Sequence, residues 1–193
     1  MPSSIVKTAF ALVMVLGMGV MTGCVQDSIQ VKGSLNARHV STHLAEAAKK
    51  GYIRTEITGN PLGVSDALWI EHILSVFKSS HFGPTFDFLI DAPANPVTDA
   101  RFVVQFQPPP STTLKTICSV PDKLAASIPP ENDQLTAFAA LCVWGRPLDW
   151  AFVTGPMPAS LDDERLTRFA STITLNVVRS NLRETDGCDS SNC

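Results

Sequence analysis

The stretch Tyr52-Ile-Arg-Thr-Glu-Ile-Thr58 alternates between apolar and polar side chains and is followed at once by Gly59-Asn-Pro61. A period of two is typical of a β-strand that buries one face. Here one side carries Ile53, Thr55 and Ile57, and the other carries Arg54, Glu56 and Thr58. Glycine and proline then end the strand. Residues 85–90 and 101–107 alternate in the same way, so we expect a sheet with one buried face.

Helical periodicity is found on both sides of this strand. Apolar residues recur every three to four positions over 35–50, and Gly51 is a suitable stop for that helix. A second helix is predicted from Ser65, its N-cap, to about residue 79. A third is predicted from Ser160 to about residue 179, with Ser160 as the N-cap and Asp163 completing a capping box.

Further strands are predicted over 134–144, which is dense in apolar residues, and over 150–153, and a helical turn is predicted over 122–127. The strands alternate rather than run apolar throughout. We therefore predict an α+β fold: a single domain with a mainly antiparallel sheet of about four strands, packed against two to three helices on one face. In that sheet, 85–90 and 101–107 would form an antiparallel pair with a long connection.

The N-terminus has the three parts of a secretory signal peptide. Residues 1–7 carry one cationic side chain, Lys7, and no acid; residues 9–21 are apolar residues and glycines without interruption; and Thr22-Gly23-Cys24 follows. The apolar run is shorter than the roughly 20 residues that span a hydrocarbon core, which argues against a transmembrane helix. We therefore expect residues 1–23 to be removed during export.

The residues around Cys24 resemble the lipobox of bacterial lipoproteins, in which a small residue precedes an invariant cysteine. The resemblance implies cleavage after Gly23, a diacylglyceryl thioether on Cys24 and a mature chain held in the membrane by this lipid. Met21 stands where the family usually has leucine, and Val25 follows the cysteine. The absence of aspartate at position 25 implies the outer membrane, facing the periplasm. An ordinary signal peptide with a chance cysteine is the alternative.

With Cys24 acylated, four cysteines are left to pair in an oxidising compartment: Cys118, Cys142, Cys188 and Cys193. Three pairings are possible from the sequence alone. We favour Cys118 with Cys142, which closes a loop of about 24 residues, and Cys188 with Cys193, which lie in the same polar tail. The alternative leaves one of the tail thiols free or pairs it with another chain.

The mature chain divides into a tether over 24–33, one domain over 34–183 and a polar tail with two cysteines over 184–193. Removal of residues 1–23 takes away one lysine and lowers the formal net charge from −3 to −4. A mildly acidic chain offers no electrostatic basis for binding nucleic acid. The phenylalanine content and the moderate charge favour a folded domain over disorder.

The sequence carries no specific catalytic motif. The sharpest local signal is His39 and His43, one helical turn apart, with Glu46 on the same face, a set that could hold zinc. The His-Glu-x-x-His pattern of metalloproteases is absent, and Lys50 continues the face with a cation. We interpret this face as the solvated side of a helix and predict no metal and no cofactor. The three residues are the candidate ligands if the protein is a metal-dependent hydrolase.

Two tryptophans, Trp144 and Trp150, flank the turn Gly145-Arg146-Pro147. Tryptophan and arginine dominate binding hot spots, so Trp144, Arg146 and Trp150 form a candidate surface for an envelope protein partner. Packing of the rings in the core at a strand turn is the alternative.

Three pieces of the mature chain resemble a loose group of uncharacterised proteobacterial envelope lipoproteins: Arg54–Gly63, Arg101–Pro109, and the cysteines at 118 and 142. The resemblance implies an envelope lipoprotein with a central disulfide, and it carries no known activity. We expect a lipid-anchored accessory, assembly or interaction module that is not an enzyme. A metal-dependent hydrolase and a periplasmic binder of a small or lipidic ligand are the alternatives.

Overall fold

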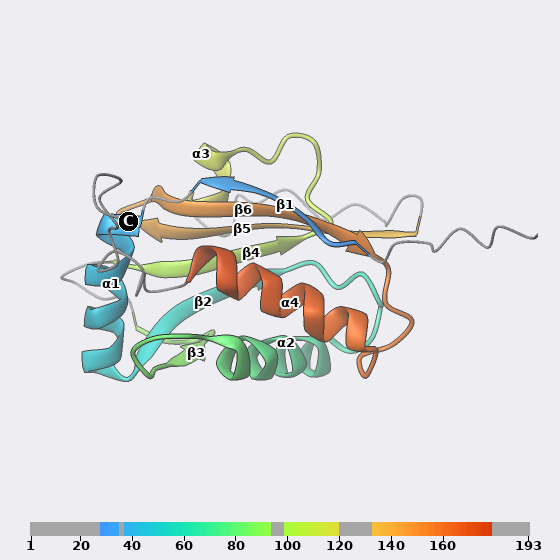
Figure 1. Ribbon diagram of the computed structural model, residues 1–193, viewed down its shortest axis with the longest axis horizontal. Helices are drawn as coiled ribbons and strands as arrows, with labels where there is room; N and C mark the ends of the chain where they lie inside the picture. The colour runs from blue at the N-terminus through green and yellow to red at the C-terminus, as the bar shows by residue number, and fades with distance from the viewer. Residues whose placement is uncertain (1–27, 35–36, 94–98, 120–132, 179–193) are drawn as a thin grey trace, which may run out of the picture.

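Strand β2 (Tyr52–Thr58) forms where the alternation predicts it and lies inside a six-stranded sheet (Figure 1). The computed structural model describes residues 28–34, 37–93, 99–119 and 133–178. The other strands are β1 (Gln30–Ser34), β3 (Asp87–Leu89), β4 (Arg101–Phe106), β5 (Gln134–Val143) and β6 (Arg146–Pro156). The helices are α1 (Ala37–Lys50), α2 (Asp66–Ser80), α3 (Leu114–Ile117) and α4 (Glu164–Val177). The predicted α+β class is confirmed.

The sheet is mixed, with three antiparallel and two parallel strand pairings. Its strand order is β1-β6-β5-β4-β2-β3; the first four strands pair antiparallel, and β2 runs parallel to both of its neighbours. The prediction of a mainly antiparallel sheet of about four strands is therefore not exact, because the sheet has six strands and β2 pairs parallel with both of its neighbours. The expected pairing of β3 with β4 is also wrong, because β2 lies between them. Helix α2 connects β2 to β3, and a long crossover of this kind is what allows two neighbouring strands to run parallel.

Helices α2 and α4 cover one face of the sheet, and α1 stands across one end of it (Figure 1). Their apolar side chains and those of the sheet form the main core. Trp69 of α2 packs edge-on against Phe106 of β4, with ring centroids 4.9 Å apart, and Phe106 lies 6.4 Å from Phe169 of α4. Ser65 caps α2 as predicted, because its hydroxyl oxygen accepts the Leu68 amide at 3.4 Å.

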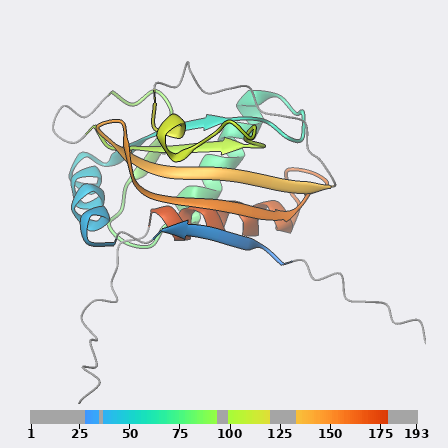
Figure 2. The same cartoon turned by 90° about the horizontal axis from the view of Figure 1, so that it is seen from above.

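The opposite face of the sheet carries a smaller second core. Helix α3 lies over this face, on the other side of β5 and β6 from α4 (Figure 2). The buried residues of the second core are Val103, Ile117, Cys118, Phe138, Ala140 and Cys142. An apolar layer on each side explains why all six residues of β4 are buried. The prediction that helices cover only one face is therefore wrong for α3.

Residues 30–33, predicted to belong to the tether, are part of strand β1. This strand pairs antiparallel with β6, from Gln30 opposite Thr154 to Ser34 opposite Trp150. Gly33 is required at this close approach, because a Cβ there would lie 2.5 Å from the Trp150 carbonyl oxygen. The sequence of β1 has little apolar periodicity, so hydrogen bonding to β6, rather than a hydrophobic pattern, places it in the sheet.

Helix α4 begins three residues later than predicted, because Asp163 and not Ser160 is its N-cap. The Arg165 guanidinium donates to the Asp163 carboxylate at 2.6 Å, and the backbone amides of Ala159 and Arg165 donate to it at 2.8 and 3.0 Å. These hydrogen bonds hold the pKa of Asp163 well below its usual range, and the one from the Arg165 side chain has the largest effect. A carboxylate is a better cap than a hydroxyl here, since it accepts several donors at once and faces the positive end of the helix dipole.

The long hairpin of β5 and β6 gives the sheet two well-separated ends (Figure 1). One end holds the turn of this hairpin, residues 143–146, which we call the hairpin tip. At the other end, which we call the base, β1 begins beside the last residues of β6. The first and last of the 11 residues of β6 are ten steps apart, which separates the tip from the base by about 33 Å at about 3.3 Å per step.

Candidate functional site

The hairpin tip exposes a tryptophan. Trp144 and Gly145 are the two residues between β5 and β6, and their φ angles are both positive, at 53° and 70°. Two-residue turns with positive φ at both positions match the twist of hairpin strands and are favoured there. The Trp144 side chain is 59 % exposed, and Arg146 is exposed as well. Two of the three residues predicted to form a partner surface therefore lie at the tip.

Trp144 adopts a backbone conformation that is unfavourable for tryptophan. A positive φ brings the Cβ of an L-residue close to its own carbonyl oxygen, so glycine, asparagine and aspartate usually fill this position of the turn. The strain costs on the order of 1 kcal/mol, which a glycine or asparagine would avoid. Strained residues of this kind cluster at functional sites, which makes the exposed ring of Trp144 the leading candidate for a binding role.

A disulfide ties the hairpin tip to helix α3. Cys118 and Cys142 are bonded, with their Cα atoms 5.5 Å apart, and both are completely buried in the second core. The predicted pairing of these two cysteines is confirmed. Gly145 lies over the same backbone, since a Cβ at this position would be 3.7 Å from the Cys118 carbonyl oxygen. A covalent bond two residues before Trp144 therefore holds the tip in place.

A buried ion-pair network beside the disulfide is a part of the site that the sequence did not reveal. Arg101 is 8 % exposed and Glu56 is 9 % exposed, and Arg101 Nη1 donates to Glu56 Oε1 at 3.1 Å. Arg54 reaches the same carboxylate oxygen at 3.1 Å. Arg101 Nη2 donates to the carbonyls of Cys118 at 2.5 Å and of Ser119 at 3.0 Å. Arg101 therefore fixes the backbone at the end of α3, next to the disulfide.

The parallel register of β2 and β4 explains why these charges meet. Arg54 lies directly opposite Arg101 on the neighbouring strand. Two guanidinium groups in such positions repel each other unless an anion lies between them, and Glu56 supplies that anion. Arg54 and Glu56 lie on the polar side of the strand in the sequence pattern, so the charges themselves were visible. Only the register of the two strands shows that they share one site.

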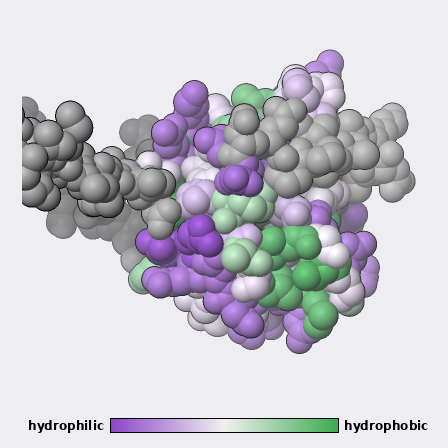
Figure 3. Space-filling view, turned by 90° about the vertical axis from the view of Figure 1, so that its right-hand side faces the viewer, coloured by the Kyte–Doolittle hydropathy of each residue, from purple (hydrophilic) through white to green (hydrophobic). Residues whose placement is uncertain are grey.

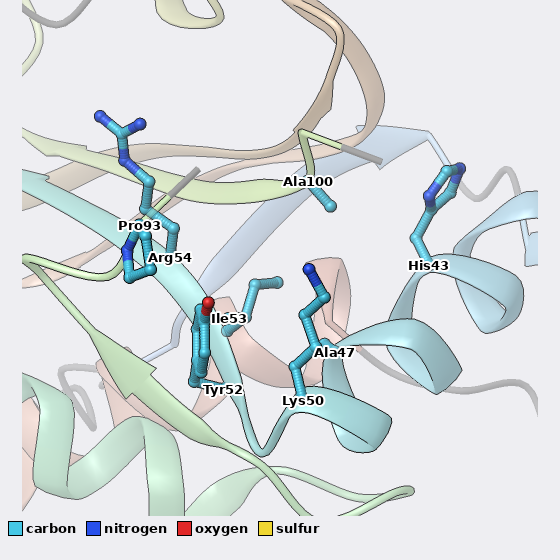
Figure 4. A pocket seen from close by; sticks show the side chains of 8 residues that line it. All are labelled: His43, Ala47, Lys50, Tyr52, Ile53, Arg54, Pro93 and Ala100. Carbon is cyan, nitrogen blue, oxygen red and sulfur yellow. The ribbon is translucent and has the colours of Figure 1, made fainter. Parts of the chain in front are cut away.

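A shallow pocket opens next to this network, between α1, β2 and the segment that leads into β4 (Figure 4). Its interior has room for about one water molecule, and its polar lining comes from His43, Lys50, Tyr52 and Arg54. The Lys50 ammonium and the Tyr52 hydroxyl point into this space, whereas the Arg54 guanidinium turns away from it. The lining contains cations and a hydroxyl but no carboxylate, so it suits an anion better than a metal ion.

Trp150, the third residue of the predicted partner surface, is not at the tip. It lies in β6 and packs edge-on against Phe138 at the margin of the second core, with ring centroids 5.8 Å apart. Its side chain is half-buried. Packing near a strand turn, the alternative for the tryptophans, therefore describes Trp150, while Trp144 and Arg146 are the exposed pair.

The residues considered as metal ligands lie on helix α1. Glu46 pairs with Lys49 at 2.5 Å, and His43 lines the pocket. The side chain of His39 lies outside the described residues. Within the described ranges, no three His, Cys, Asp or Glu side chains come together in a group that could hold a metal ion. Metal analysis of the purified protein is the direct test of this hypothesis.

The cysteines at positions 24, 188 and 193 lie outside the described residues, as do the predicted signal peptide, the helical turn over 122–127 and the polar tail. Among the described helices, none combines the length and the apolar character needed to cross a membrane. No protein-family model matches the chain, and no curated protein or solved structure is significantly similar to it. The function must therefore be inferred from the geometry of the hairpin tip and the base.

Proposed function

We propose that the protein is a lipoprotein of the bacterial envelope, anchored through Cys24, whose domain binds a protein partner with its hairpin tip. The observation that carries the binding role is Trp144, an aromatic residue that is 59 % exposed in a strained two-residue turn. Tryptophan and arginine contribute most to the hot spots of protein interfaces, and Arg146 is exposed at the same tip. This role is non-enzymatic.

Rigidity of the hairpin tip supports the proposal. The tip is a tight turn between two paired strands. The disulfide from Cys142 to Cys118 fixes the end of β5 that leads into this turn. A surface that is already ordered loses little conformational entropy when a partner binds, which favours affinity. The Trp144 ring offers a flat apolar area and Arg146 a planar cationic fork. The expected partner surface therefore combines an apolar pocket with a carboxylate.

The positions of the tip and the base also fit an anchored protein. The chain reaches β1 at the base, and the tip lies about 33 Å away along β6. An anchor at one end of the sheet leaves binding residues at the other end accessible. A disulfide between Cys118 and Cys142 is favoured in the oxidising compartment that an exported protein enters.

The anchor is tested by mass spectrometry of the mature protein from cells. We expect an N-terminal Cys24 that carries a diacylglyceryl thioether, and partition of the protein into the detergent phase. The Cys24→Ser chain should lose both properties. A mature protein that starts at another residue and carries no lipid would contradict the anchor.

The binding role is tested by cross-linking in intact envelopes, followed by purification of the lipidated protein and quantification of the partners. Trp144→Ala should reduce recovery of the specific partner by roughly 30-fold, the loss that corresponds to a hot spot of about 2 kcal/mol. Arg146→Ala should reduce it less strongly. Phe82→Ala is the matched control, because Phe82 is an aromatic residue that is 68 % exposed in the segment after α2. A partner set unchanged by Trp144→Ala would rule out the tip.

A further inference from the structure

The base of the sheet carries an apolar surface that partner binding at the tip leaves unexplained. Leu68, on the first turn of α2, is 55 % exposed. Leu62 and Val64 precede it in the loop after β2, and Met157 and Leu161 lie in the loop before α4; these four are partly buried against the main core. We call the five residues the basal patch. Figure 3 shows hydrophobic side chains gathered on this end of the molecule.

The described chain begins at the same end as the basal patch. Gln30, the first residue of β1, lies opposite Thr154 near the end of β6. Ile29 lies against Gly155, with its side chain 3.4 Å from the place that a Cβ of Gly155 would take. Met157 follows β6 directly. The start of the domain and the basal patch therefore share the base.

A lipid on Cys24 would restrict how far the base can move away from a membrane. Ser28, the first described residue, is four positions after Cys24. A chain of that length spans at most about 14 Å. The base is thus the part of an anchored molecule that stays closest to the bilayer, and the basal patch lies within reach of the lipid surface.

The charges around the basal patch distinguish between lipid surfaces. Asp66, Asp133 and Asp162 are exposed at the base. Arg165, a nearby cation, is held by the Asp163 carboxylate at 2.6 Å. Exposed carboxylates are repelled by anionic headgroups and are tolerated by zwitterionic ones. The base therefore suits a zwitterionic lipid surface.

We infer that the basal patch docks on the zwitterionic headgroup surface of the membrane that holds Cys24. This inference rests on the lipid anchor proposed above. The acyl chains raise the effective concentration of the patch at the bilayer, so a small apolar surface that would not bind alone stays in contact. Docking also orients the molecule, with the base against the lipid and the hairpin tip directed away from it.

Hydrogen exchange of the lipidated mature protein in phosphatidylcholine vesicles tests the docking, after mass spectrometry of the same sample has confirmed the acyl group. The reference is the unlipidated Cys24→Ser chain, exported with an ordinary signal peptide. Ser65 caps the Leu68 amide, but the amides before it at the start of α2 have no partner within the helix, so they exchange quickly unless a surface covers them. We expect several-fold slower exchange over 61–68 and 157–162 in the vesicles, and unchanged exchange over 143–147.

Leu68→Ser should remove most of this protection. Phe82→Ser is the matched control at the other end of α2, where the side chain is even more exposed, and it should leave the protection unchanged. Added phosphatidylglycerol should weaken the protection, because of the carboxylates at the base. Equal exchange with and without vesicles in the acylated protein overturns the docking and leaves the anchor intact, whereas a mature protein without an acyl group overturns both. Protection that Phe82→Ser also removes, or that phosphatidylglycerol strengthens, overturns the assignment to the basal patch.

Discussion

Removal of the disulfide between Cys118 and Cys142 should lower the free energy of unfolding by about 3.5 kcal/mol. The perturbation is the double substitution Cys118→Ala and Cys142→Ala in the second core. Alanine is preferred to serine, because the sulfur atoms lie in a buried apolar site. Burying a serine hydroxyl there would add a desolvation cost of its own.

The magnitude follows from the loop that the bond closes. The two cysteines are 24 residues apart. Closing a loop of that length removes about 12 cal/mol/K of entropy from the unfolded chain, or about 3.5 kcal/mol at 25 °C. Since a domain of ordinary stability has about 5–15 kcal/mol in total, the melting temperature should fall by roughly 10 °C. Loss of the two fully buried sulfur atoms adds a packing cost of the same sign.

Denaturation in guanidinium chloride, followed by the fluorescence of the buried Trp69 and the other tryptophans, measures this difference. Reduced wild-type protein separates the loop entropy from the packing cost, because it keeps both sulfur atoms. The double variant in the same reductant controls for effects at Cys188 and Cys193. A loss below about 1 kcal/mol in both the reduced protein and the double variant would refute the reasoning, because the bond would then not be what confines the unfolded chain.

Arg101→Met should lower the free energy of unfolding by about 3 kcal/mol in the same assay, because it removes one cationic partner of the buried Glu56 carboxylate. Adding Glu56→Leu should restore much of the loss. Strictly additive effects of the two substitutions would argue against the pairing. Asp163→Asn should lower the melting temperature by a few degrees at pH 7. Because the folded-state pKa of Asp163 is depressed, its charge stabilises the fold above the unfolded-state value of about 4, and that stabilisation is lost as the pH falls toward the folded-state pKa. Thermal melts should therefore show the difference shrinking below about pH 4, and a difference independent of pH would contradict this role. Gly33→Ala places a Cβ 2.5 Å from the Trp150 carbonyl oxygen, so hydrogen exchange should speed up over 30–34 while 134–143 stays protected; unchanged protection of β1 would show that the strand can adjust.

Several features of the fold and of the candidate site were determined by the sequence alone, because neighbouring residues decide them. Strand β2 ends where the alternation ends, and α2 starts directly after its cap, Ser65. A cap and a period of two depend on residues only a few positions apart. The short loop between Cys118 and Cys142 favoured their pairing in the same way. Trp144 was visible as a candidate because its residue type stands out beside a turn.

The tertiary structure decided how these pieces combine. The alternation of β2 does not show which strands flank it, and only the parallel register with β4 brings Arg101 opposite Arg54 and within reach of Glu56. The hairpin register likewise places Trp150 at the margin of the second core and Trp144 at an exposed tip, far from the base. The physical reason is that strand pairing and burial on two faces depend on partners distant in the chain. Local propensity does not determine which strands become neighbours. Hydrogen bonding across the whole sheet does.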